Sequence, residues 1–180
     1  TIEKAENNKD YALLLSTCAG AWRYMIGDVI RFVDVEHANI IISGRTKHFL
    51  SLVGEHLSVD NMNKAIEHLS QVLDIEIPEY MVTGIPYEGS FAHQWYLGTN
   101  KAFDVDKARK ILDDKLKEVN DDYAVERISA LKDVFVQAVP SEYFYEFMTQ
   151  KGKMGGQNKF PRVMKSTQAE EWKSFLAGKI

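Results

Sequence analysis

The chain has 180 residues, of which 45% are hydrophobic and 27% are charged, and its formal net charge at pH 7 is −4. This composition is ordinary for a globular protein with one or two compact units, and the acidic total argues against a nucleic-acid-binding protein, which needs a broad basic face. No apolar run approaches the roughly 18 to 20 residues that a membrane-spanning helix needs. The single cysteine, Cys18, cannot form an internal disulfide, so we expect a cytoplasmic protein.

The first part of the chain, residues 11–52, contains short β-type runs separated by turn residues. Such tight spacing predicts an antiparallel meander. Within it, Gly27 and Asp28 are predicted to form a turn between two strands, where a carboxylate beside a glycine can accept hydrogen bonds from the hydroxyls of a ligand. An ordinary turn aspartate is the alternative interpretation.

From Ser58 onward the hydrophobic spacing becomes mainly helical, with two strand-like runs in between. The expected elements are a helix over 59–73, strands over 79–85 and 90–97, a helix capped by Asp104 or Asp106, a helix over about 122–131, a strand over 134–139, and helices beginning at Ser141 and Ser166. This order predicts an α+β fold with helices on one face of an antiparallel sheet. We place a domain boundary between residues 46 and 47, the alternative being one continuous fold.

A basic loop at residues 151–165 contains five basic residues and no acidic one. Gly155 and Gly156 allow main-chain N–H groups to approach a ligand closely, and Lys159 could place an ammonium group beside it. A local positive feature on an acidic body favours a small anionic ligand. The alternative is a solvated surface loop.

Two further residue types bear on chemistry. The five histidines are scattered without the spacing of metal ligands, and one cysteine excludes a zinc cluster, so we expect no metal site in this chain. Arg45, which follows Gly44, could bridge a phosphate or a carboxylate with its fork of donors, or could simply be solvated.

Three segments, in this order, resemble one enzyme family: CAGAWRYMIGDVIRF, SGRTKHFLSLVGEHLS and GGQNKFPRV. Together they resemble the C-terminal part of the Gretchen Hagen 3 family of acyl acid amido synthetases, the auxin-inducible plant enzymes and their bacterial relatives. These enzymes belong to the acyl-adenylate-forming superfamily. The resemblance covers nearly the whole chain.

The resemblance implies a two-domain ligase that activates a carboxylic acid with ATP and magnesium and then passes the acyl group from acyl-AMP to the amine of an amino acid. It implies that Asp28 binds the ribose hydroxyls, and that Tyr24 belongs to the same nucleotide site. Arg45 would lie at the hinge with a nucleotide contact. Lys159 would reach the active site from the mobile C-terminal domain. Lys47 stands where the superfamily commonly has a hinge aspartate.

Neither a phosphate-binding loop rich in glycine, serine and threonine nor an acyl-pocket segment is found in this sequence. The resemblance assigns both, and the magnesium ligands, to a preceding large domain. We therefore expect residues 1–46 to be the last part of that large domain and residues 47–180 to be a separate C-terminal lid domain. We also expect the fragment to be inactive alone. Residues 153–158 are expected to be poorly ordered in this fragment or to be held by lattice contacts.

Two alternatives stay open at this point. The chain could be a free-standing α+β module that binds a small ligand or another protein. It could also belong to a relative that forms a thioester in place of an amide. The sequence names neither the acid, nor the acceptor, nor the oligomeric state.

Overall fold

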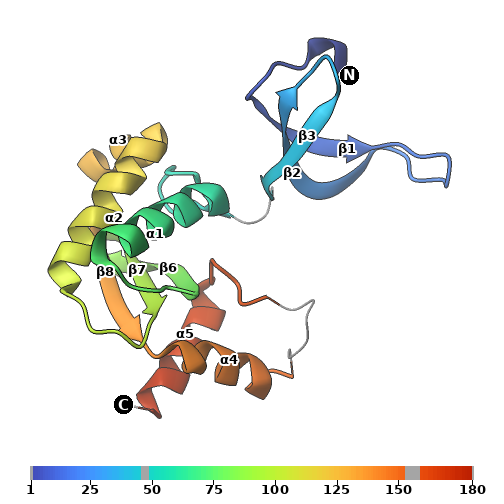
Figure 1. The fold of residues 1–180 in the computed structure, drawn as a ribbon. Helices are drawn as coiled ribbons and strands as arrows, with labels where there is room; N and C mark the ends of the chain where they lie inside the picture. Colours follow the sequence, from blue (N-terminus) through green and yellow to red (C-terminus); the bar gives the residue numbers. More distant parts are fainter. Residues whose placement is uncertain (1, 46–48, 153–158, 180) are drawn as a thin grey trace. The chain divides into compact units, whose positions relative to one another are not determined.

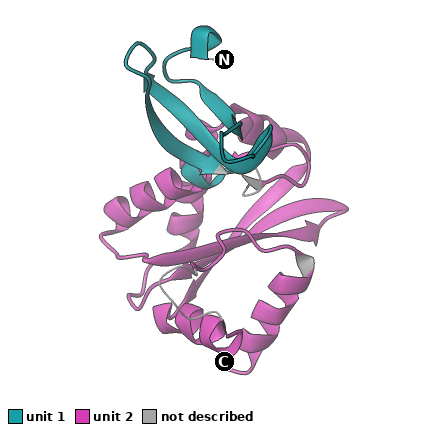
Figure 2. Ribbon diagram, turned by 90° about the vertical axis from the view of Figure 1, so that its right-hand side faces the viewer, with its two compact units in different colours: residues 1–49, 58–60 teal, residues 50–57, 61–180 magenta. Residues whose placement is uncertain are grey.

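The structure, a computed structural model, describes residues 2–45, 49–152 and 159–179 (Figure 1). The chain divides into two compact units (Figure 2). Unit 1 comprises residues 1–49 and 58–60, and unit 2 comprises residues 50–57 and 61–180. The predicted boundary at residues 46 and 47, the hinge position Lys47 and the expected disorder of residues 153–158 all lie outside the described residues.

Unit 1 is built on a three-stranded antiparallel sheet in the order β1-β2-β3. Its elements are the 3-10 helix η1 (Ile2–Lys4) and the strands β1 (Asp10–Leu15), β2 (Tyr24–Asp34) and β3 (Asn39–Arg45). The predicted meander is therefore confirmed.

The predicted turn at Gly27 and Asp28 is wrong, because both residues lie inside the long strand β2. The pairing of β2 with β1 shifts register between Ala12 and Leu14, opposite this point. Gly27 has φ +90°, a conformation that glycine adopts without strain. A glycine within a strand pattern can mark a bulge as well as a turn, and here it marks an irregularity of the strand.

Unit 2 is built on a mixed sheet in the order β6-β7-β8. The strands are β6 (Glu79–Tyr87), β7 (Ser90–Gly98) and β8 (Leu131–Val139), and the helices are α1 (Val59–Leu73), α2 (Val105–Val119), α3 (Asp121–Ser129), α4 (Ser141–Gln150) and α5 (Ser166–Ala177). The α+β class is confirmed. The hairpin β6-β7 is antiparallel as expected, but β8 runs parallel to β7, which corrects the expectation of a wholly antiparallel sheet. The helices α2 and α3 form a crossover that brings the chain back beside the first residues of β7, so β8 begins at the same end as β7.

The helices of unit 2 cover both faces of its sheet, which corrects the expectation of one covered face (Figure 1). Successive strand residues point to opposite faces: Tyr80 and Val82 belong to the core cluster beneath α1, α2 and α3, whereas Met81 belongs to the cluster beneath α4 and α5. Two layers of helices thus bury the sheet between them. Among the described helices, none has the length and apolarity to cross a membrane.

Two short strands, β4 (Phe49–Leu50) and β5 (Leu57–Ser58), pair with each other ahead of α1. The loop that joins them carries Gly54 at φ +119° and His56 at φ +37°. Leu50 and Leu57, at its two ends, are buried in the core of unit 2. The loop is therefore part of that unit.

Candidate functional site

Asp28 and Arg45 are brought together by the pairing of β2 with β3, in which they are direct partners. The side chain of Asp28 is half-buried, and the strand irregularity at Gly27 immediately precedes it. The side chain of Arg45 is not among the described parts of the structure. Two residues that the sequence places in separate segments therefore share one end of a sheet.

Tyr24 is the first residue of β2 and pairs with Leu15 of β1, and among the described residues it has no partner in β3. Its side chain is 58% exposed. The structure therefore places Tyr24 in the same strand as Asp28 but outside the β2-β3 pairing that joins Asp28 to Arg45.

Lys159, the predicted catalytic residue, lies in unit 2 and is exposed. The next residue, Phe160, is buried against the rings of Phe144 and Trp172, at centroid distances of 4.8 and 5.3 Å. The chain therefore changes from solvent to core within one residue, immediately after the lysine.

The residues that follow Phe160 are fixed to the outer edge of β6. Val82 donates its N–H to the carbonyl of Arg162 at 2.9 Å, and Met164 donates its N–H to the carbonyl of Val82 at 3.1 Å. Val163 forms a parallel bridge with Val82. Because β6 pairs with β7 on its other side, this segment covers an edge that would otherwise expose unpaired main-chain groups.

The side chain of Arg162 adds a second attachment to the same strand. Its guanidinium lies 4.4 Å from the centroid of the Tyr80 ring, forms an ion pair with Glu79 and donates to the carbonyl of Tyr80 at 3.2 Å. Tyr80 in turn donates its hydroxyl to Asn63 of α1 at 2.6 Å. Burial raises the pKa of Tyr80, so its hydroxyl stays protonated as a donor.

Glu55, in the LVGE segment that carries part of the resemblance, is fully buried. Its carboxylate accepts the N–H groups of Leu52 at 2.9 Å and Val53 at 3.0 Å, and lies 3.0 Å from Nε2 of His93. Burial opposes ionisation, but the hydrogen bonds from His93 and the main chain outweigh it and lower the pKa of Glu55 to about 2. Glu55 therefore holds the β4-β5 loop to β7 as a carboxylate.

The side chain of Leu52, in this loop, packs directly on a glycine of the sheet. A Cβ at Gly84 of β6 would lie 2.3 Å from Cδ1 of Leu52. Glycine therefore allows the loop to pack directly on the strand.

His93 links this loop to a second buried polar group. Burial lowers the pKa of His93, so a neutral ring donates from Nε2 to Glu55. Nδ1 is buried and has no hydrogen-bond partner among the described residues. The ring lies 5.8 Å from that of Tyr123, whose hydroxyl donates to Asp113 at 2.7 Å.

Asp113 also pairs with Arg127 and Lys117, at 2.8 Å each. The group that these residues form with Tyr123, His93 and Glu55 is not predicted by any motif of the sequence. The signal available was a glutamate that directly follows a glycine within the mostly apolar stretch Leu52 to Leu57. Since Glu55 and His93 have no exposed surface, we assign them to folding and not to catalysis.

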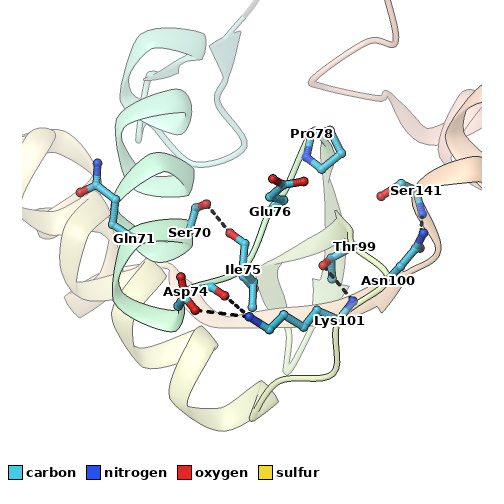
Figure 3. Close-up of a pocket in the computed structure, with 10 residues that line it drawn as sticks. All are labelled: Ser70, Gln71, Asp74, Ile75, Glu76, Pro78, Thr99, Asn100, Lys101 and Ser141. Carbon is cyan, nitrogen blue, oxygen red and sulfur yellow. Dashed lines mark hydrogen bonds and ion pairs between the residues drawn. The ribbon is translucent and has the colours of Figure 1, made fainter.

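An open hollow of about 840 Å³ lies elsewhere on unit 2 (Figure 3). Lys101 spans part of it, with its ammonium bound to the carbonyl and the carboxylate of Asp74, and Ser141 donates its N–H to Asn100 at 3.1 Å. Its lining residues are Ser70, Gln71, Asp74, Ile75, Glu76, Pro78, Thr99, Asn100, Lys101 and Ser141. None of the four predicted site residues lines this hollow, so we assign it no ligand.

Magnesium prefers carboxylate and water oxygens. In residues 2–45, 49–152 and 159–179, no group of three or more histidine, cysteine, aspartate or glutamate side chains could hold a metal ion. We therefore assign no magnesium ligand to the described residues.

Residues 60–168 match the GH3 family C-terminal domain, and residues 1–42 match the GH3 family central domain, GH3 being the abbreviation of Gretchen Hagen 3. The match to the C-terminal domain alone covers more than half of the chain. The chain therefore belongs to the GH3 family.

Solved structures extend the comparison to the fold. The "GH3.15 acyl acid amido synthetase" has a TM-score of 0.75 and 21% identity, with 97% of this chain and 34% of that chain covered. The "AtGH3.15 acyl acid amido synthetase in complex with 2,4-DB" has a TM-score of 0.72 and 21% identity, with 98% and 33% covered. The chain spans about a third of the length of these relatives. No curated protein sequence matches it significantly.

Proposed function

We propose that residues 1–180 form the C-terminal portion of an ATP-dependent acyl acid amido synthetase. The carboxylate of an acid attacks the α-phosphorus of ATP, pyrophosphate leaves, and acyl-AMP forms. The amine of an amino acid then attacks the acyl carbon, AMP leaves, a proton is released, and an amide forms. The observation that carries this proposal is the family match in both units.

The nucleotide would bind at the end of the β2-β3 pairing. A carboxylate such as Asp28 is an acceptor that suits the two hydroxyls of a ribose, and the neighbouring Arg45 carries a charge that suits a phosphate. Their direct pairing supports a shared role. The exposed ring of Tyr24 lies further along the same strand and would contact the nucleotide from there.

Lys159 would act in the first of the two steps. Negative charge accumulates on the phosphoryl oxygens as the carboxylate attacks, and a fixed ammonium stabilises that charge best where water has been excluded. Its exposure supports a lysine that acts on a ligand outside its own core. The second step takes place at the acyl carbon, where charge develops on the acyl oxygen and on the departing AMP, and we place Lys159 at the attack on phosphorus in the first step.

The sheet of unit 1 supports the proposal that these residues work within a longer protein. Ile41 and Ile42 of β3 point to opposite faces, and both are exposed, Ile42 by 70%. A sheet with apolar side chains on both faces is typical of strands that other elements cover on both sides. Catalysis would then need those elements, which would also hold the magnesium. A cytoplasmic location also stays a proposal, supported by the single, exposed Cys18.

The test is Lys159→Ala in the intact, natural-length protein. We expect ATP-pyrophosphate exchange to fall about 10²- to 10³-fold, the loss typical of one charge-stabilising donor. Lys173→Ala, an exposed lysine of α5, is the matched control and should keep its activity. Full exchange activity in Lys159→Ala would remove this lysine from the mechanism.

The acceptor is tested separately. The intact protein is incubated with ATP, a carboxylic acid that supports pyrophosphate exchange, and equimolar amino acid and thiol. An amide product supports the proposal, whereas a thioester product would show that the protein is a thioester-forming ligase. Absence of both, with no pyrophosphate exchange for any acid, would favour a binding module.

A further inference from the structure

We infer that Arg162 is a positioning residue for Lys159, and that it acts by fixing residues 160–164 to the edge of β6. This inference rests on the proposed function of Lys159. The two residues are three positions apart, and of the two residues between them Phe160 is buried and Pro161 is half-buried. These contacts therefore fix the position of the main chain from which the Lys159 side chain extends.

The attachment of Arg162 has two points along β6. Its carbonyl accepts from Val82, while its guanidinium reaches back to Glu79 and to the carbonyl and ring of Tyr80. Two contacts at different positions on one strand fix the direction of the attached segment as well as its place. Phe160 then fixes the end nearest the lysine within the aromatic cluster of Phe144 and Trp172.

The chemistry of the contact suits arginine specifically. A guanidinium can stack on an aromatic face and donate from its edge to a carboxylate and a carbonyl at the same time, whereas an ammonium is a single point charge. The ion pair is largely shielded, with 27% of the Arg162 side chain and 17% of the Glu79 side chain exposed. Water therefore screens it less than it screens a surface pair.

A misplaced lysine would affect one half-reaction more than the other. Displacing a catalytic group by about 1 Å can cost about 10²-fold in rate, but only in the step where that group acts. On the proposed function this step is adenylation. A purely structural arginine would instead lower adenylation and acyl transfer together, since both need the folded domain.

The geometric part can be tested on the 180-residue chain by hydrogen exchange. Arg162→Gln should accelerate exchange of the Met164 and Val82 amides at least about tenfold relative to amides between β7 and β8, because the segment loses one of its two attachments. Arg109→Gln, which removes a more exposed ion pair with Asp133, is the matched control and should leave Met164 and Val82 unchanged. Unchanged exchange in Arg162→Gln would overturn the inference.

The catalytic part uses the intact protein, with the carboxylic acid that gives the highest pyrophosphate exchange in a panel of acids. Arg162→Gln should lower kcat for pyrophosphate exchange about 10²-fold and leave transfer from the synthetic acyl-AMP of that acid within about twofold. Arg162→Lys should recover only part of the loss. If Arg162→Gln does not fold, the same comparison of pyrophosphate exchange with acyl transfer is made with Arg162→Lys and Glu79→Gln.

A double variant separates this inference from the proposed function. If Arg162 acts through Lys159, then adding Arg162→Gln to Lys159→Ala should cause no further loss of adenylation, because the two substitutions remove one effect. A full additional loss, or equal losses in both half-reactions, would overturn the positioning role alone. Normal activity of Lys159→Ala would instead remove Lys159 from the mechanism, and absence of pyrophosphate exchange in the unsubstituted intact protein would refute the proposed function.

Discussion

The two units differ in how completely they bury their own apolar side chains. In the described part of unit 1, Ile30 is the one large hydrophobic residue that is buried, while Trp22, Met25 and Ile42 are each more than half exposed. Unit 2 has a core on each side of its sheet. The difference indicates that unit 2 buries its own core on both sides of its sheet, whereas the residues proposed to bind the nucleotide stand on a sheet whose apolar side chains are mostly exposed.

Among the substitutions that test this difference, Trp172→Ala in unit 2 should have the largest effect on stability. Trp172 is fully buried and contacts the rings of Phe144, Phe147 and Phe160. Its truncation should lower the free energy of unfolding by about 3 to 5 kcal/mol, the usual range for a buried aromatic residue. Urea denaturation of the 180-residue chain, followed by far-ultraviolet circular dichroism, measures the change. A loss below about 1 kcal/mol would mean that α5 is not part of a cooperative core.

Acid should weaken unit 2 through its buried polar group. The pKa of Glu55 is lower in the folded chain than in the unfolded one, so the stability it contributes is complete above about pH 4.5 and is lost as the pH falls towards about 2. The full shift corresponds to about 3 kcal/mol. His93 acts in the same direction from a higher pH, because its pKa is lowered in the folded state and the unfolded chain takes up a proton first below about pH 6.5.

The check is the urea midpoint of unit 2 between pH 7 and pH 2, in the wild type and in Glu55→Gln. The variant should be less stable at pH 7 and should lose less stability than the wild type between pH 4.5 and 2. Glu67→Gln, an exposed residue of α1, is the control for general charge effects. Parallel profiles for Glu55→Gln and the wild type would contradict the assigned role.

The sequence predicted well the elements that local spacing determines. The helix expected over 59–73 and the helix expected to begin at Ser166 have those limits in the structure, because an apolar stripe with a period of 3.6 residues is visible within one segment. The pairing of two distant strands is not visible in this way. The parallel direction of β8 and the second covered face of the sheet therefore had to come from the structure.

The site shows the same limit. Asp28, Arg45 and Lys159 can be selected from short motifs, but the contacts that fix segments of unit 2 join residues far apart in the chain. Glu55 and His93 are 38 residues apart, and Arg162 and Glu79 are 83 apart. A glycine inside a strand pattern is also ambiguous, and at Gly27 it indicated a turn although the strand continues through it. Long-range contacts and strand irregularities are properties of the folded chain, so sequence pattern alone does not specify them.

Trp22→Ala in unit 1 should have the smallest effect on stability. It is the same substitution as Trp172→Ala, made at an exposed position. Trp22 is 81% exposed, so its truncation removes little buried surface and should change the free energy of unfolding of the 180-residue chain by at most about 0.5 kcal/mol. In the intact protein the proposed cover would bury this side chain, and the same substitution should then cost about 3 kcal/mol or more. Equal, small effects in both proteins would mean that nothing covers this end of the sheet, and the proposed place of unit 1 in a larger domain would be wrong.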